Sequence, residues 1–231
     1  MANWHQFDSR DAMVAALKSA IGARLSAAIA SGRRASWAVS GGSTPAPLFQ
    51  AMQNDPLTWG QIDVALVDER WVAFDHPRSN EAFVAANLKG GNASTAHIVG
   101  MKTDHAKAAD AVGAVNKRYS KIAQPFDSVL LGLGGDGHTA SLFPGAEGLT
   151  AAFNPAADTC VALTANRSDV TGDEVERMSL SASAIARAPH VTLMIMGAAK
   201  KQVLEAALAP NSDLPIGRLH KMKSFDVYWA P

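Results

Sequence analysis

Five short apolar runs that alternate with helical patterns constrain the fold of this chain more than any other feature. The runs are SWAVS (36–40), DVALV (63–67), DSVLLGL (127–133), CVALTA (160–165) and VTLMIMG (191–197). Short apolar runs of this kind are typical of strands buried on both faces of a sheet. Apolar residues at helical spacing occupy most of the segments around them, at 8–31, 45–52, 80–88, 105–122 and 200–208. This alternation predicts an α/β fold whose mostly parallel sheet is flanked by helices on both faces.

The chain is expected to form a single domain over residues 1–231. Its apolar content of 48% is enough to build a continuous core. No repeat, low-complexity tract or linker divides the sequence. We therefore predict no internal domain boundary.

Composition and charge exclude several classes of partner. The 21 Lys and Arg residues balance 21 Asp and Glu residues, so nothing favours a nucleic-acid-binding surface. Lys18 and Arg24 interrupt segment 8–31, no apolar run of about 18 residues is present, and the first residues lack a secretory-signal pattern. The single cysteine, Cys160, allows neither an internal disulfide nor a cysteine-based metal site. We expect a cytoplasmic protein, monomeric or a small homo-oligomer, that acts on a small molecule without nucleic-acid or membrane partners.

Three unusual segments follow the predicted strands, and ligands of open α/β sheets bind beyond the carboxyl ends of strands. The first is SGGSTP (40–45). Gly41 and Gly42 allow the backbone to turn tightly beside a ligand, while Ser43 and Thr44 supply hydroxyl and N–H groups at the start of a helix. This pattern predicts a phosphate-binding turn. The alternative is a plain strand-to-helix turn with a Ser or Thr cap.

The second segment is DER (68–70), where Arg70 is the main candidate for binding. A guanidinium group suits a phosphate or a carboxylate-like oxyanion, because it presents a planar fork of donors. Asp68 and Glu69 could orient that fork. The alternative is a set of solvated surface charges, which is the commoner situation for any one of them.

The third segment is LGLGGDGHTASLFPG (131–145), whose Gly132, Gly134 and Gly137 match the spacing G-x-G-x-x-G. A dinucleotide-binding turn would open the first βα unit and be followed by an acidic residue at the end of the next strand. Here the motif lies past mid-chain, and Asp158 precedes the next predicted strand. We therefore interpret the segment as a catalytic loop that presents His138, a side chain able to exchange protons near neutral pH.

Two further expectations concern the surroundings of His138. Asp136 could orient the imidazole, or it could cap the turn. No second histidine or cysteine stands at ligand spacing, so we expect no metal at this position. The sequence also lacks the G-x-S-x-G pattern of a serine nucleophile.

Taken together, these segments resemble the 6-phosphogluconolactonase family. The resemblance rests on SGGSTP, DERWV with SN at 79–80, LGLGGDGHTASLFPG, ERMSLS (176–181) and MGAAKKQVL (196–204), in the order found in the family. The related glucosamine-6-phosphate deaminases share the G-x-D-G-H core and the Gly-rich turn. They typically continue the core with I-A-F-N-E-P and carry DEY in place of DER.

The resemblance implies a Rossmann-like fold of the NagB/RpiA/CoA transferase type. It also implies hydrolysis of 6-phospho-D-glucono-1,5-lactone to 6-phospho-D-gluconate without a metal or organic cofactor. The general base of the family falls on His138, its substrate-binding arginine on Arg70 and the lysine of its G-x-x-K motif on Lys200. Gly42, Ser43 and Thr44 match the phosphate turn.

The resemblance also places Arg177 in the phosphate clamp, although the family often has a proline-rich approach where this chain has GDEVER. Two alternative functions are considered. One is an amino-sugar phosphate deaminase or isomerase that would use Asp68 and Asp136 as proton shuttles. The other is a non-catalytic sugar-phosphate sensor, which would have no need of His138.

Overall fold

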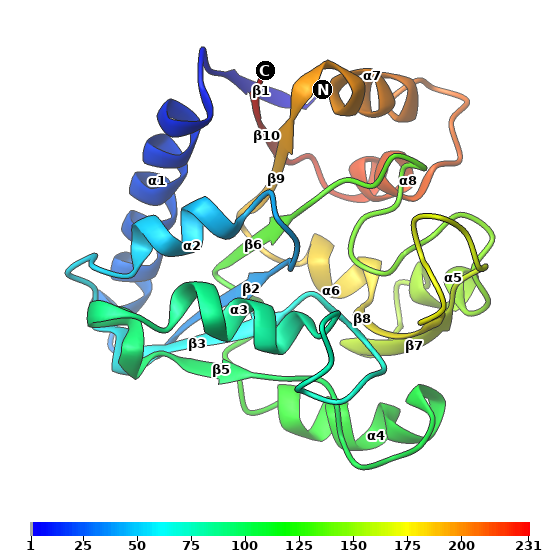
Figure 1. Cartoon of the computed structure of the whole chain (residues 1–231), viewed down its shortest axis with the longest axis horizontal. Coiled ribbons are helices and arrows are strands. Elements are labelled where there is room, and N and C mark those ends of the chain that lie inside the picture. Colours follow the sequence, from blue (N-terminus) through cyan, green and yellow to red (C-terminus); the bar gives the residue numbers. More distant parts are fainter. Residues whose placement is uncertain (1) are drawn as a thin grey trace.

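The main sheet of the protein is parallel throughout and contains seven strands. The computed structural model describes residues 2–231. The strand order is β1-β10-β9-β6-β2-β3-β5. In chain order, these strands are β1 (Asn3–Gln6), β2 (Ala35–Val39), β3 (Ile62–Leu66), β5 (His97–Val99), β6 (Ser128–Leu131), β9 (Val191–Met196) and β10 (Asp226–Ala230). The predicted α/β fold with a mostly parallel sheet is confirmed (Figure 1).

A second, antiparallel sheet contains three strands in the order β4-β8-β7. They are β4 (Asp68–Arg70), β7 (Cys160–Thr164) and β8 (Glu176–Leu180). The run at 160–165 therefore forms a strand as predicted, but it lies in this second sheet and not beside the parallel strands. The α-helices are α1 (Arg10–Ala30), α2 (Ala46–Met52), α3 (Asn80–Leu88), α4 (Ala108–Tyr119), α5 (Leu149–Ala152), α6 (Ala182–Ala186), α7 (Gly197–Ala207) and α8 (Pro215–Met222).

The order of the parallel strands sets where a ligand can bind. From β2 the chain moves outward through β3 and β5, then returns and continues through β6, β9 and β10 toward the other edge. Right-handed crossovers in opposite directions place α1, α2 and α3 on one face and α4, α6 and α7 on the other (Figure 1). The switch point lies between β2 and β6, where their following loops diverge and leave a crevice.

Helix α1 is a core helix of this layered structure. Ser9 caps it by accepting a hydrogen bond from the N–H of Ala12. Its side chains at i, i+4 spacing are fully buried, namely Met13, Leu17, Ile21 and Leu25. By length and mean hydropathy α1 could cross a membrane, so the expectation that no segment of the chain is apolar enough was wrong. The buried face shows that these side chains pack into the protein core.

The chain passes directly from the parallel sheet into the second sheet at Val67, the residue between β3 and β4. The N–H of Val67 donates to Val39, and its carbonyl accepts from Leu180. The buried Tyr119 hydroxyl completes this junction, because it accepts from the N–H of Leu66 at 3.0 Å and reaches the Leu66 carbonyl at 3.1 Å. These bonds satisfy backbone groups that the departing strand leaves unpaired. They also direct β4 to the carboxyl end of the parallel sheet.

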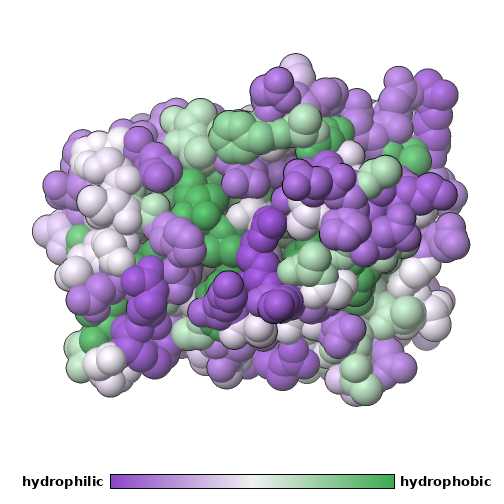
Figure 2. Space-filling model, turned by 90° about the horizontal axis from the view of Figure 1, so that it is seen from below, coloured by the Kyte–Doolittle hydropathy of each residue, from purple (hydrophilic) through white to green (hydrophobic). Residues whose placement is uncertain are grey.

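The surface in Figure 2 is mostly hydrophilic, with small hydrophobic areas between the polar side chains. Exposed large hydrophobic residues are few among residues 2–231 and include Phe74 and Val170.

Candidate active site

A cavity of about 630 Å³ lies beyond the carboxyl ends of β2 and β6, at the switch point of the sheet. Its walls come from residues 40–45 and 132–135 together with Asp68, Arg70, Asn80, His138, Ala140, Val170 and Lys200. The cavity thus unites all three segments that follow the predicted strands. It is the place where the fold alone would predict a ligand.

The turn at 40–45 joins β2 to α2 without a side-chain cap. Gly42 has φ of +99°, a conformation that favours glycine. A Cβ atom at Gly41 would collide with the side chain of Asn80. Pro45 stands at the start of the helix, and no side-chain hydrogen bond caps it. Because Ser43 and Thr44 do not act as caps, their hydroxyl groups remain available at the cavity wall.

The glycine-rich loop after β6 is built around His138. A Cβ atom at Gly134 would collide with the imidazole Nδ1, and Gly137 has φ of +82°. The N–H of Gly134 donates to the His138 carbonyl at 2.8 Å, which closes the loop tightly. Among the described residues, no helix begins between Leu131 and Leu149. The segment therefore lacks the strand-to-helix geometry of a dinucleotide-binding turn, and its glycines make room for the histidine.

Asp136 both orients His138 and stabilises the turn. Its Oδ1 atom lies 2.6 Å from His138 Nδ1 and also accepts the backbone N–H of His138 at 3.2 Å. Burial acts to raise the pKa of Asp136, but the hydrogen bonds and charge of His138 outweigh it and hold the pKa below its ordinary value. Because Nδ1 faces Asp136, the other ring nitrogen, Nε2, is the one available to a ligand. The two roles considered for Asp136 are thus combined in one oxygen atom.

Arg70 lies at the cavity wall and is held by backbone, not by its acidic neighbours. Its Nη1 donates to the carbonyl of Arg78 at 2.6 Å, and its buried Nε has no hydrogen-bond partner in the described chain. The expectation that Asp68 and Glu69 orient its guanidinium was wrong. Asp68 instead accepts from the Ser141 hydroxyl at 2.6 Å and lies against the Asn80 amide.

Glu69 is fully buried and caps helix α3. Its carboxylate accepts the backbone N–H groups of Asn80 and Glu81 at 2.7 and 2.8 Å, and that of Arg70 at 2.9 Å. Burial raises the pKa of Glu69 to about 7, although these three bonds act in the opposite direction. The role of Glu69 is structural: it fastens the segment that follows Arg70 onto the start of α3.

We expect Glu69 to make stability depend on pH. An acid whose pKa is higher in the folded state stabilises the fold below its unfolded pKa, and this contribution is lost as pH rises through the folded pKa. The window runs from 4.5 to about 7 and corresponds to a loss of roughly 3 kcal/mol. Denaturant titrations of wild type and Glu69→Gln across this range should show wild type losing stability relative to the variant. If the difference in unfolding free energy between wild type and Glu69→Gln stayed constant with pH, Glu69 would not be the group responsible.

Lys200 and Arg177 differ in their relation to the cavity. Lys200, in the first turn of α7, lies at the wall with its Nζ beside Gly135. No hydrogen bond or ion pair joins its ammonium group to any of residues 2–231. Arg177, in contrast, is only 2% exposed in β8 and is not part of the cavity wall. The structure therefore does not place Arg177 where the phosphate clamp would need it.

Some residues of the site were not expected from the sequence. Val170 reaches the cavity from the loop between β7 and β8, a polar segment without periodicity that gives no sequence signal. Phe143 lies inside the motif SLFP, and its ring centroid is 4.1 Å from that of His138. Within residues 2–231 there is no group of three His, Cys, Asp or Glu side chains placed to hold a metal ion.

Comparison with known proteins places the chain in a family. The family model of glucosamine-6-phosphate isomerases/6-phosphogluconolactonase matches residues 8–229. A 6-phosphogluconolactonase of Rhizobium meliloti is 37% identical, with 100% of this chain and 99% of the relative covered. One of Mesorhizobium japonicum is 36% identical, with 99% and 95% covered. The crystal structure of a 6-phosphogluconolactonase from Shewanella baltica OS155 is 32% identical and covers 100% of this chain and 98% of that chain, with a TM-score of 0.92. The chain belongs to the family of glucosamine-6-phosphate isomerases and 6-phosphogluconolactonases.

Proposed function

We propose that this protein is a 6-phosphogluconolactonase, a carboxylic ester hydrolase that converts 6-phospho-D-glucono-1,5-lactone to 6-phospho-D-gluconate in the pentose phosphate pathway. The full-length relatives carry this name. The observation that carries the proposal is the pairing of His138 with Asp136 at 2.6 Å, on the wall of a cavity that also holds Arg70 and Lys200. A base and two cations in one cavity suit hydrolysis of an anionic ester.

The reaction requires a base and a bound water molecule. His138 Nε2 takes a proton from water as its oxygen attacks C1 of the lactone, and a tetrahedral oxyanion forms. When the carbonyl re-forms, the bond between C1 and the ring oxygen breaks. The ring oxygen takes the proton back from His138 and becomes the 5-hydroxyl group of the product. The new carboxylic acid releases its proton to solvent and becomes the carboxylate of 6-phospho-D-gluconate. Asp136 keeps the imidazole in one orientation and stabilises its positive charge during these steps.

The cavity wall also offers groups that suit the phosphate group of the substrate. We assign it to the Gly41–Thr44 turn, whose hydroxyl and N–H groups stand at the start of α2, and to the cations of Arg70 and Lys200. Lys200 has no competing partner within residues 2–231, so its ammonium group is free to meet an anion. Fixing the phosphate fixes the ring, so that water and His138 meet C1 in a reactive geometry.

We further infer that the chain works as a single cytoplasmic domain on this small molecule, without nucleic-acid or membrane partners and as a monomer or small homo-oligomer. The balanced charge and the burial of α1 against the sheet support this inference. Deamination of glucosamine 6-phosphate, the alternative enzyme activity, would use Asp68 as a proton shuttle. Asp68 instead accepts hydrogen bonds from Ser141 and Asn80, so its carboxylate oxygens are already held by protein groups.

The test is a coupled assay that follows 6-phosphogluconate formation from freshly generated lactone. The purified protein should accelerate product formation above the spontaneous rate, equally with and without a chelator. Ammonia release from glucosamine 6-phosphate, measured in parallel, should stay at background. Ammonia release without lactone hydrolysis would show that the protein is a deaminase and not a lactonase. The absence of both activities would favour the non-catalytic sugar-phosphate sensor.

A further inference from the structure

Arg177 is a buried cation that the proposed reaction does not use. It pairs with Arg70 across the antiparallel ladder of β4 and β8, so two like charges stand side by side. Burial lowers the pKa of Arg177 to about 10, with the charge of Asp68 opposing this effect and that of Arg70 adding to it. Burying a guanidinium is costly unless its surroundings compensate. The groups in contact with Arg177 therefore show which parts of the protein its buried charge holds in place.

The guanidinium of Arg177 has a hydrogen bond to a loop and a cation–π contact to an aromatic ring. Its Nη2 donates to the carbonyl of Thr171 at 3.1 Å, which ties it to the loop between β7 and β8. Its Cζ lies 5.4 Å from the centroid of the Phe143 ring, within the range of a cation–π interaction. Its Nε has no hydrogen-bond partner among residues 2–231. The ring of Phe143 is thus a principal neighbour of the charge.

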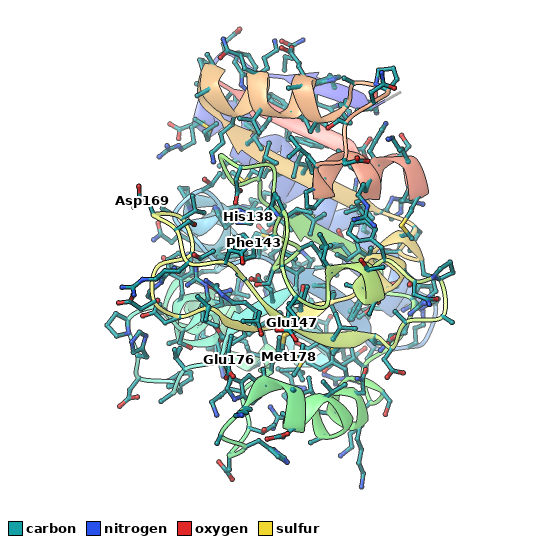
Figure 3. The ribbon with its side chains drawn as sticks, turned by 90° about the vertical axis from the view of Figure 1, so that its right-hand side faces the viewer. His138, Phe143, Glu147, Asp169, Glu176 and Met178 are labelled. Carbon is teal, nitrogen blue, oxygen red and sulfur yellow. The ribbon has the colours of Figure 1, made fainter. Side chains whose placement is uncertain are left out.

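Phe143 links this guanidinium to the imidazole. Its side chain is buried, and its ring is tilted by 32° from that of His138, with the centroids 4.1 Å apart. Figure 3 shows His138 and Phe143 next to each other. Asp136 holds one edge of the imidazole, whereas Phe143 supports its ring plane. A shift of Phe143 would therefore move His138 even with the Asp136 contact intact.

We propose that Arg177 is a positioning residue: its guanidinium holds the Phe143 ring in place, and this ring keeps the imidazole of His138 directed into the cavity. The proposal rests on the proposed function of His138 and assigns Arg177 a role different from phosphate binding. The bond to Thr171 extends the same support to the loop that carries Val170 at the cavity wall. Arg177 acts on the imidazole of His138 through Phe143.

A double-mutant cycle on the full-length enzyme tests this chain of contacts. Arg177→Met and Phe143→Leu should each lower kcat about tenfold with little change in KM, because the base is misplaced but the phosphate contacts remain. The double variant should be about as active as either single variant, since both remove the same support. Arg167→Met is the matched control, because Arg167 is an exposed arginine in the loop between β7 and β8, paired with Asp173; this variant should match wild type.

Other outcomes would overturn the proposal. An Arg177→Met enzyme with raised KM and unchanged kcat would show that Arg177 binds the phosphate. If the fold-losses of kcat in the two single variants multiplied in the double variant, Arg177 and Phe143 would act independently of each other. A second readout is the proton NMR shift of His138 Cε1–H, which the neighbouring aromatic ring displaces. It should move in folded Arg177→Met and Arg177→Lys proteins, and an unchanged shift would contradict the proposal. This readout needs no substrate, so it remains informative even if the lactonase assignment fails.

Discussion

Replacing His138 with alanine is expected to lower kcat by about 10²–10⁴-fold, the contribution of a well-placed general base. The residual rate would come from the bound phosphate and the remaining polar groups of the cavity. The fold should survive, because the bonds that close the loop do not involve the imidazole: Gly134 N–H donates to the His138 carbonyl, and the Thr139 hydroxyl donates to the Gly132 carbonyl at 2.9 Å. The measurement is kcat with fresh lactone, corrected for spontaneous hydrolysis.

The control for this experiment is His105→Ala, which removes an exposed histidine outside the cavity wall. It should retain wild-type kcat, and thermal unfolding of both variants should confirm that they are folded. Wild-type kcat in the His138→Ala enzyme would show that another group activates the water. A lower Tm combined with normal kcat would leave His138 a purely structural residue.

Replacing Arg70 with alanine is expected to act mainly on substrate binding. Hydrogen bonds to charged groups contribute about 1.5–3 kcal/mol, so KM should rise by about 10- to 150-fold while kcat changes much less. The guanidinium is held at the cavity wall by the Arg78 carbonyl at 2.6 Å, which reduces the entropy lost when it meets a phosphate. Initial rates over a range of lactone concentrations separate the two constants.

Arg70→Lys is the matched variant, since it keeps the positive charge but loses the planar fork of donors. Its KM should lie between those of wild type and Arg70→Ala. If Arg70→Ala lowered kcat and left KM unchanged, the guanidinium would act on the developing oxyanion and not on the phosphate.

The local pattern of the sequence was sufficient to predict the strands and helices that pass through the core. Segments 45–52 and 80–88 closely match α2 and α3, and the runs at 36–40 and 63–67 match β2 and β3. Burial on both faces leaves an apolar run wherever such a strand occurs. The edge strand β1 was not predicted, because its sequence NWHQ is only partly buried and has no apolar run. The short strand β4 is also charged, and its pairing partner β8 lies more than 100 residues away in the chain.

The residues of the site could be predicted where they lie together in a short sequence motif. The position of His138 and Asp136 within one tight loop follows from the glycines around them. In contrast, Glu69 has the sequence context of a surface charge, and only the approach of Asn80 and Glu81 makes it a helix cap. The sequence shows which hydrogen-bonding groups a side chain has. It does not show which backbone groups of another helix or strand will lie next to that side chain in the fold.

The sequence by itself determined the alternation of strands and helices and the three polar segments after strands, because periodicity and glycine requirements are local properties of the chain. The tertiary structure decided that these segments meet at one switch point, since strand order depends on packing across the whole sheet. It also decided that Arg177 lies behind Phe143 and not at the cavity wall. The physical reason is that the surroundings of a charge come from residues distant in sequence, and these surroundings determine whether it meets solvent, ligand or the protein core.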